Sequence, residues 1–509
     1  MKERKDSAGR RNFRHAPLKI CLQAAAGVTA LNEVSRIKAA FRQPRCQYTR
    51  SGRSMETGGR RDTVHGAGPG KLPAAARGSR VINAAFPSRL SSHFTAGSDR
   101  SDSLHRRSSI SVPVVLPHAV SAPRSLTDVY GPGIAVCARP ELAAAEPVNR
   151  HRHTRDVVSA RPIAVAADMP VICSAGGTDP DLLAHLRDSG LPVGTDLREF
   201  RNEREFADRV TEAISDGLLM SMEYPQPTTL CPDERALKSA QLVGYLNNKA
   251  SITTLVDPRF QAHRSVVTRG QLAEAAPAEK SWVLKAATND AHGGSLDVYL
   301  HQAHEQITLP AFTDVLNEFV VEEYLQILRN WGLQFYVAAD ARARLLAVTE
   351  QRVDAIGVYA GGRFGVVTTP PAELLAECLA ITQRAADVGY RGLCSLDCAE
   401  TRDGQQVVLD LNFRITSGSI PLLAMQSVRP GALDLPAESV KLTVAGPLTD
   451  LLAGIRPELA AGGLLIVAGH DTGHTDSPLR QSTLQLLVLG DDPGEVTARR
   501  RTLEEKIGK

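Results

Sequence analysis

The chain has 509 residues, which predicts more than one domain, and its 43% hydrophobic and 23% charged residues are typical of a globular protein. A net charge of +3 argues against nucleic acid or a membrane surface as a partner, and no apolar run is long enough to span a bilayer. We expect a cytoplasmic protein, because no secretion signal opens the chain and its eight cysteines show no CxxC pair and no regular spacing.

Residues 1–155 differ in composition from the rest of the chain. Lys and Arg outnumber Asp and Glu there, and Ser, Gly and Pro are abundant, as in "SGRSMETGGRRDTVHGAGPG". Such a segment buries too little apolar surface to offset its chain entropy, so we expect disorder. A basic nucleic-acid-binding tail and a transit peptide are alternatives. A third is a start assigned too far upstream, in which case Met169 is the natural first residue.

Residues 156–235 alternate between strand and helix patterns. "MPVICSAGG" and "GLLMSME" are typical of strands, and "DPDLLAHLRDSG" and "REFADRVTEAIS" of helices. This order predicts a small α/β domain with a parallel sheet.

A helical pattern covers residues 233–248, at the start of the region 236–430, and the pattern of predicted elements changes after it. Short strands are predicted at 264–270 and 281–288, and a helix at 295–307, followed by mostly alternating strands between 318 and 369. A helix over 372–389 precedes two strands, "LCSLDCAET" and "QQVVLDLNFR", joined by a short turn. The pattern predicts an antiparallel sheet. Residues 431–509 add two strands and a final helix, which predicts a C-terminal α/β appendage.

One strand, "VVLDLNFR", carries polar side chains at alternate positions. Asp410, Asn412 and Arg414 therefore point to one face, and the hairpin brings Asp397 near Asp410. Two carboxylates and an amide oxygen are hard ligands suited to Mg²⁺, and an arginine beside them can pair with an anion. The alternative is an ordinary solvated strand face.

Four further features are weak when taken singly. Lys285 lies inside the apolar strand "SWVLKAA", and "HGGS" follows it with a glycine pair, Gly293 and Gly294, that could expose backbone N–H groups to a phosphate. Glu322 and Glu323 end the strand "FVVEEYL", and Lys249 ends a helix. A solvated lysine, a turn and an exposed acidic pair explain these features equally well.

Taken in order, these motifs resemble those of the ATP-grasp superfamily of ATP-dependent ligases. The likeness runs from about 240 to 430 through "NNKAS", "WVLKA", "NDAHGGS", "FVVEEYL", "GLCSLD" and "VVLDLNFR". It implies an ATP-grasp fold, with a pre-grasp domain at 156–235, the grasp domain at 236–430 and the appendage at 431–509. The C-terminal stretch "GGLLIVAGHD…LQLLVLGDDPGEV" resembles the pheganomycin-type peptide ligases of secondary metabolism.

The resemblance also implies residue roles. ATP would be bound by the two lysines, by the glycine pair and by a hinge, the end of "FVVEEYL" from Glu322 to Leu325. Gln334 or, as second choice, Asn330 would contact the ribose. The ATP-binding set is then Lys249, Lys285, Gly293, Gly294, Glu322, Glu323, Leu325 and Gln334. Asp397, Asp410 and Asn412 would hold Mg²⁺, and Arg414 would act in catalysis on the transferring phosphoryl group. The sequence departs from the family pattern at Asp410, where Glu is common, and at Phe413, where Pro is common.

The implied reaction is ATP-dependent ligation of a small-molecule carboxylate to an amine through an acyl phosphate, with release of ADP and phosphate, in peptide natural-product biosynthesis. Many relatives by resemblance are dimers, which suggests a homodimer. Two alternatives stay open: a carboxylase that activates bicarbonate, and a nucleotide-binding protein without catalysis.

Overall fold

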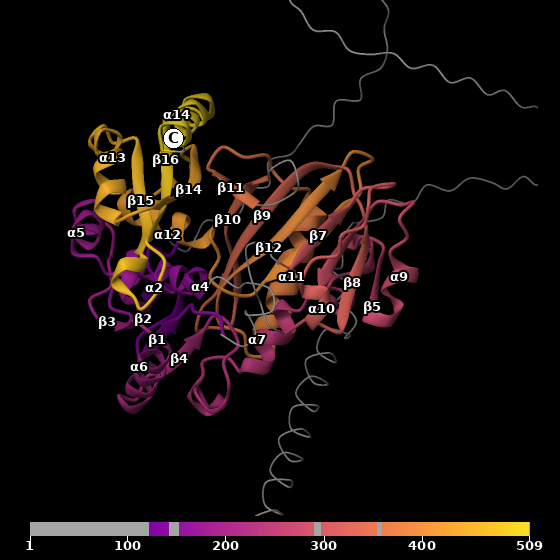
Figure 1. Ribbon diagram of the computed structural model, residues 1–509, viewed down its shortest axis with the longest axis horizontal. Coiled ribbons are helices and arrows are strands. Elements are labelled where there is room, and N and C mark those ends of the chain that lie inside the picture. The colour runs from indigo at the N-terminus through magenta and orange to yellow at the C-terminus, as the bar shows by residue number, and fades with distance from the viewer. Residues whose placement is uncertain (1–121, 142–151, 290–296, 354–358, 508–509) are drawn as a thin grey trace, which may run out of the picture. The chain divides into compact units, whose positions relative to one another are not determined.

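The computed structural model describes residues 122–141, 152–289, 297–353 and 359–507, which fold as a mixed α/β structure (Figure 1). Within these ranges the strands form a parallel sheet in the order β3-β2-β1-β4, a large antiparallel sheet in the order β13-β12-β9-β10-β11-β14-β16-β15, and a small antiparallel sheet in the order β5-β8-β6-β7. The α/β class predicted from the sequence is thus confirmed. None of the described helices is both long and apolar enough to cross a membrane.

The parallel sheet starts earlier in the chain than the sequence patterns predict. Its strands are β1 (Ile134–Cys137), β2 (Val171–Ser174), β3 (Leu197–Phe200) and β4 (Leu219–Met222), with helices α5 (Pro180–Asp188) and α6 (Glu203–Ser215) between them. β1 pairs with both β2 and β4, so it lies inside the sheet. The predicted disorder of residues 1–155 is therefore wrong for the described part, because α2 (Leu126–Tyr130) and β1 lie within it.

The reason for this error is the short length of the element. All four residues of β1 are buried, which an apolar run of four residues between glycines and a proline does not reveal by periodicity. Ser125 and Asp128 form a capping box at the start of α2, a local signal that the basic composition of the flanking chain obscured.

The large sheet is one continuous antiparallel ladder. Its first five strands in spatial order are β13 (Gln406–Asn412), β12 (Gly392–Thr401), β9 (Ile327–Val337), β10 (Ala343–Val353) and β11 (Tyr359–Phe364). They continue into β14 (Ala437–Ala445), β16 (Gln481–Leu489) and β15 (Leu464–Asp471). The predicted C-terminal appendage is consequently not a separate layer, because β14 pairs with β11 through Arg363 and Phe364.

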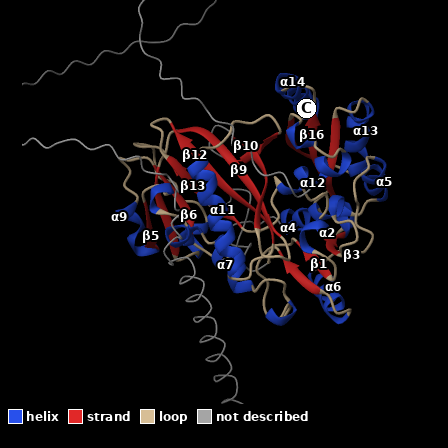
Figure 2. Ribbon diagram, turned by 180° about the vertical axis from the view of Figure 1, so that it is seen from behind, coloured by secondary structure: helices blue, strands red, loops and turns tan. Residues whose placement is uncertain are grey.

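Helices pack against the apolar side chains of the large sheet. Helix α11 (Ala372–Asp387) packs against β9 and β10, as the view from behind shows (Figure 2). α13 (Leu448–Ala460) packs on β15 and β16, and α14 (Pro493–Ile507) packs on β14 and β16. A core under α11 takes Trp331, Leu333 and Phe335 from alternate positions of β9. The intervening residues of β9 therefore face the opposite side, where the candidate site lies.

The small sheet contains β5 (Arg264–Thr268), β8 (Glu318–Glu323), β6 (Trp282–Ala286) and β7 (Val298–His301). Short helices α9 (Leu272–Ala275) and α10 (Phe312–Val315) accompany it. The helix predicted over 295–307 is wrong in its described part, since Val298–His301 pairs with β6 as a strand, with His301 opposite Trp282. Cross-strand pairing of aromatic and β-branched residues outweighed a local pattern that favoured a helix.

Helices also frame the junction between the two larger sheets. α7 (Ala240–Asn247) begins seven residues later than the predicted start at Asp233, because Ser239 caps it by accepting from the backbone N–H of Leu242. The chain also forms α4 (Arg152–Ser159), α8 (Ile252–Leu255) and α12 (Ser419–Val428), and α12 packs against β12 and β15.

A fully buried ion pair joins the parallel sheet to the large sheet. Lys238 Nζ lies 2.7 Å from Glu223 Oε1, and both side chains are 0% exposed. The Tyr130 hydroxyl donates to the same carboxylate, and Glu223 Oε2 accepts from the backbone N–H of Ile415, 2.8 Å away. Tyr130 also meets β12 closely. Gly392 has a φ of +122°, and a Cβ there would lie 2.6 Å from the Tyr130 hydroxyl, so only glycine fits.

We expect that a chain lacking residues 1–168, as a start at Met169 would give, fails to accumulate as soluble folded protein. It loses β1, whose backbone pairs with both neighbours, and the Tyr130 bond to Glu223. Expression yield and the circular dichroism melting curve would measure this. A chain that begins at residue 122 keeps every described element and serves as the control. Equal melting curves for the two chains would contradict the expectation.

Lys238→Met should lower the free energy of unfolding by about 3–5 kcal/mol, because it leaves the buried Glu223 carboxylate without its counter-charge. Lys506→Met is the matched control, since Lys506 forms a 2.8 Å ion pair with Glu458 at the surface. Loss of such a pair costs about 0–1 kcal/mol. Urea unfolding of both variants would test the difference, and similar midpoints would refute it.

Candidate active site

Asp397, Asp410 and Asn412 meet on one face of the large sheet. Asp397 on β12 is directly opposite Asp410 on β13 in the antiparallel register, and Asn412 is opposite Ser395. The Asn412 amide donates to Asp397, with 3.2 Å between Nδ2 and Oδ2. The hairpin thus brings together the three side chains that the alternating pattern predicted.

The two carboxylates have different electrostatic surroundings. Burial and the negative charge of Asp410 raise the pKa of Asp397 to about 7. Burial also favours the neutral form of Asp410, but the charge and hydrogen bond of Lys249, with Lys285 and Arg414, outweigh it and lower the pKa of Asp410. A cation between the pair would relieve this repulsion. Among the described residues, no group of three or more His, Cys, Asp or Glu side chains could hold a metal, so Asn412 would have to complete the set.

Both predicted lysines reach this carboxylate region from other elements. Lys249, in the turn after α7, forms an ion pair with Asp410 and lies 3.7 Å from Asp297. Lys285 projects from β6 of the small sheet and donates to the backbone carbonyl of Leu409, 2.8 Å away. The small sheet is therefore connected to β13 one residue before Asp410.

Glu322 is engaged by neighbouring cations. Its carboxylate lies 2.7 Å from Lys285 Nζ and 3.0 Å from the Arg264 guanidinium, and its side chain is 3% exposed. The backbone N–H of Glu323 donates to His263. Leu325 lies in the connection between β8 and β9, and its backbone has no hydrogen bond among the described residues.

The two candidates for the ribose contact differ in whether their side-chain amide atoms are already hydrogen-bonded within the protein. The Gln334 amide donates to Ser395 at 2.8 Å and accepts from Ser419 at 3.1 Å, so both ends are in use. Asn330 lies nearer the hinge on the same face of β9, and its buried Oδ1 has no hydrogen-bond partner in the described part of the chain. A buried amide oxygen without a donor is costly and favours a ligand hydroxyl there. The geometry thus favours Asn330 over Gln334.

Arg414 is held by a residue that the sequence patterns did not indicate. Its guanidinium donates to Asn247 Oδ1 and lies 5.5 Å from the centre of the Tyr224 ring. Asn247 Oδ1 also accepts from the backbone N–H of Phe413 at 3.1 Å. Asn247 stands two residues before Lys249 in "NNKAS", but no role was predicted for it, so only the fold identifies Asn247 and Tyr224 as neighbours of the site.

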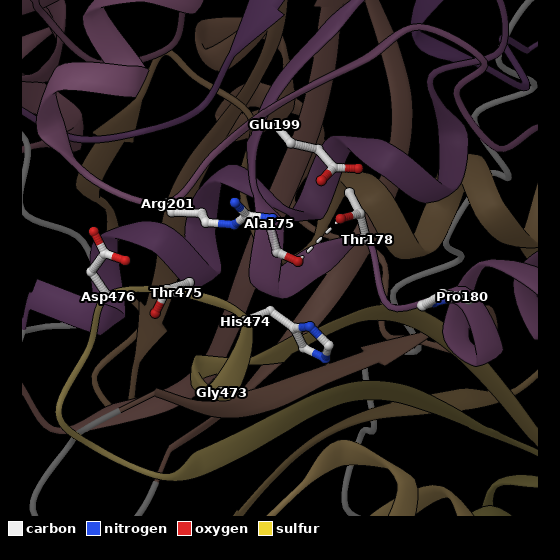
Figure 3. A pocket seen from close by; sticks show the side chains of 9 residues that line it. All are labelled: Ala175, Thr178, Pro180, Glu199, Arg201, Gly473, His474, Thr475 and Asp476. Carbon is white, nitrogen blue, oxygen red and sulfur yellow. Dashed lines mark hydrogen bonds between the residues drawn. The ribbon is translucent and has the colours of Figure 1, made fainter.

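Gly293 and Gly294, predicted to contact phosphates, lie outside the described residues. A pocket of about 580 Å³, lined by Thr178, Arg201, His474 and other residues, opens between the end of β2 and the turn before β16 (Figure 3). His474 there lies 3.5 Å from Asp179. None of the predicted site residues lines this pocket, and we place the chemistry at the carboxylate pair instead.

Two protein-family models match the chain. The model of the L-aspartate–L-methionine ligase N-terminal domain matches residues 125–244, and the model of the L-aspartate–L-methionine ligase ATP-grasp domain matches residues 262–412. Together they span more than half of the chain and include every predicted site residue except Lys249 and Arg414.

Solved structures that resemble this chain are distant from it in sequence. An ADP complex of an N5-carboxyaminoimidazole ribonucleotide synthetase is 12% identical and covers 76% of this chain and 100% of its own, with a TM-score of 0.49. The Aspergillus clavatus carboxyaminoimidazole ribonucleotide synthase with ATP is 10% identical, covers 76% of this chain and 99% of its own, and has a TM-score of 0.49. The synthetase from Thermus thermophilus is 12% identical, covers 74% of this chain and 99% of its own, and has a TM-score of 0.46.

The family matches span both the parallel-sheet region and the strands that carry the carboxylate pair. The resemblance inferred from the motifs is thereby confirmed at the level of superfamily, fold and reaction class. The chain belongs to the ATP-grasp ligases, enzymes that use ATP to join a small-molecule carboxylate to an amine.

Proposed function

We propose that this ligase joins L-aspartate to L-methionine, or a closely similar pair of amino acids, to form a dipeptide. The support is the match of both its N-terminal and its grasp region to models of an L-aspartate–L-methionine ligase. The observation that carries the catalytic part is the juxtaposition of the Asp397–Asp410 pair with two lysines from separate elements.

The nucleotide would lie between the small sheet and the large sheet. Lys249 and Lys285 would exchange their present carboxylate partners for phosphate oxygens, with Gly293 and Gly294 predicted nearby. Leu325 would offer its backbone N–H to the base, whereas Glu322 would orient Lys285 rather than bind adenine through its side chain. Asn330 would accept from a ribose hydroxyl.

Magnesium fits the oxygen donors of Asp397, Asp410 and Asn412. The raised pKa of Asp397, caused by burial and by Asp410, indicates negative charge that the described residues leave incompletely balanced. The Asn412 amide donates to Asp397 in the present state, so it would turn to present its oxygen. The ion would neutralise phosphate charge and thereby make the terminal phosphorus more electrophilic.

In the proposed reaction the acid's carboxylate oxygen attacks the terminal phosphorus of ATP, and ADP leaves. The amine nitrogen then attacks the resulting acyl phosphate, and phosphate leaves as the amide forms. Arg414, held by Asn247, is placed to stabilise negative charge on the transferred group. The protein's part is to hold charged groups in position and to keep water from the acyl phosphate.

We further propose that the enzyme works in the cytoplasm as a homodimer and takes part in peptide natural-product biosynthesis. The six described cysteines are buried free thiols, which agrees with a reducing compartment. Light scattering during size-exclusion chromatography would measure the oligomeric state.

ADP release over a panel of amino-acid pairs tests the substrate proposal. We expect the largest rate with L-aspartate and L-methionine together, and little release with either one alone. The dipeptide should be found by mass spectrometry. Release that depends on bicarbonate and one amine would instead support the carboxylase alternative. ATP binding without ADP release for any pair would support the non-catalytic alternative. Either of these two results would overturn the proposal.

Asp410→Ala should reduce kcat/KM by roughly 100-fold or more, because metal-assisted charge stabilisation contributes several kcal/mol to phosphoryl transfer. Its melting temperature should stay near that of the wild type, because Asp410 lies at the edge strand β13 and is partly exposed, and because Asp297, 3.7 Å from Lys249 Nζ, remains as a counter-charge for that lysine. Asp403→Ala, in the exposed turn of the same hairpin, is the control and should keep full activity. A fully active Asp410→Ala enzyme would exclude the metal assignment.

A further inference from the structure

Arg161 is a cation without a counter-ion in the described structure. It begins the short 3₁₀ helix Arg161–Val165, which packs between α12 and β15. Its Nε atom is buried and has no hydrogen-bond partner, and no ion pair joins Arg161 to any described residue. A buried N–H without an acceptor is costly, and because Arg161 as a whole is partly exposed, an anionic ligand could reach its guanidinium.

Two further cations lie close to Arg161. Arg414 is near enough for the two guanidinium charges to repel, and so is Lys441 on β14. Burial lowers the pKa of Arg161, and Arg414 lowers it further. Burial of the ammonium group and the charge of Arg161 likewise lower the pKa of Lys441, although the residue as a whole is exposed. No described carboxylate contributes to the pKa of either Arg161 or Lys441.

The neighbouring tyrosines locate this cluster relative to the carboxylate pair. Tyr224 and Tyr359 both interact with Arg161. Tyr359, at the start of β11, hydrogen-bonds to Ser417 and Ser439 and is close enough to Asp397 to sense its charge. Arg414 likewise interacts with both Arg161 and Asp397. Arg161 and Lys441 therefore lie beside the phosphoryl-transfer centre, on the side of β11 and β14 rather than of the small sheet.

We propose that Arg161 and Lys441 form a subsite for a second carboxylate of the substrates, one that is not activated by ATP. This inference rests on the proposed ligase function. Arg414 and the predicted metal face the carboxylate under activation, whereas Arg161 and Lys441 have no described acid to neutralise them. Two groups could supply this second carboxylate: the free α-carboxylate of the amine substrate and the remaining carboxylate of L-aspartate. Arg161 and Lys441 would then be specificity-determining residues of the ligase.

The test compares carboxylate and amide forms of each substrate in wild type and Arg161→Gln. With L-aspartate as the acid, wild type should favour L-methionine over L-methioninamide in kcat/KM by roughly 10- to 100-fold, the value of a charge-assisted hydrogen-bonded pair. Arg161→Gln should abolish most of that preference, chiefly by raising KM for L-methionine while kcat changes less. Lys441→Gln should reduce it by a smaller factor, because Lys441 is more exposed.

A second comparison varies the acid substrate. It uses L-asparagine and L-isoasparagine in place of L-aspartate, with L-methionine as the amine. If the second carboxylate belongs to the acid, wild type should reject one of these amides and Arg161→Gln should not. Either pattern supports the subsite and identifies its source. Arg456→Gln, an exposed arginine on α13, is the matched control and should leave all preferences as in wild type.

An active wild-type enzyme whose preferences survive in Arg161→Gln would overturn the subsite while leaving the ligase function intact. If no pair gives ADP release, the proposed function fails instead, and a separate measurement decides on the subsite. The melting temperature of wild type should then rise with added L-aspartate or L-methionine and that of Arg161→Gln should not. An equal rise in both proteins would overturn the inference.

Discussion

The buried pair of Glu223 and Lys238 is the contact on which the arrangement of the site depends. It lies where β4 ends and before α7 begins, and Glu223 also holds the backbone of Ile415, next to Arg414. Tyr130 brings a third part of the chain, ahead of β1, to the same carboxylate. Buried ion pairs are weak sources of net stability, but they specify one arrangement because a misplaced partner leaves an uncompensated charge. Here that arrangement fixes the parallel sheet against the segment that carries Arg414, the residue proposed to act on the phosphoryl group.

The two lysines at the candidate site are likewise paired with acidic side chains. Lys249 is paired with Asp410 and Lys285 with Glu322, so neither ammonium is buried alone. Phosphates would have to replace carboxylates that are already in place. Such preformed pairing keeps long side chains in nearly the right position and reduces the entropy lost when a ligand binds. Arg161 is different, since its charge has no acid among the described residues, and that contrast is the reason to propose a substrate role for it rather than a nucleotide role.

The sequence predicted the features that depend on local pattern. Alternation in β13 placed Asp410, Asn412 and Arg414 on one face, and the short turn after β12 brought Asp397 opposite Asp410. It could not predict contacts set by tertiary packing. Arg161 stands in no motif, Asn247 was given no role although it opens "NNKAS", and β1 is too short for its periodicity to be read. The strand Val298–His301 was mistaken for a helix because its partner strand, not its own residues, decides its conformation. The family's usual ribose position at Gln334 is filled internally, which no spacing reveals.

The unbroken hydrogen bonding from β13 to β15 has a consequence for how such enzymes diversify and for how they can be engineered. Because β14 completes the edge of β11, residues 431–507 cannot be exchanged between relatives as an independent module without exposing an open strand edge. Tyr359 and Lys441 lie on these two adjoining strands, so the carboxylate subsite proposed for Arg161 and Lys441 would adjoin this boundary. A chimera that transfers selectivity would have to carry β11 together with the C-terminal strands, along with the 3₁₀ helix that presents Arg161.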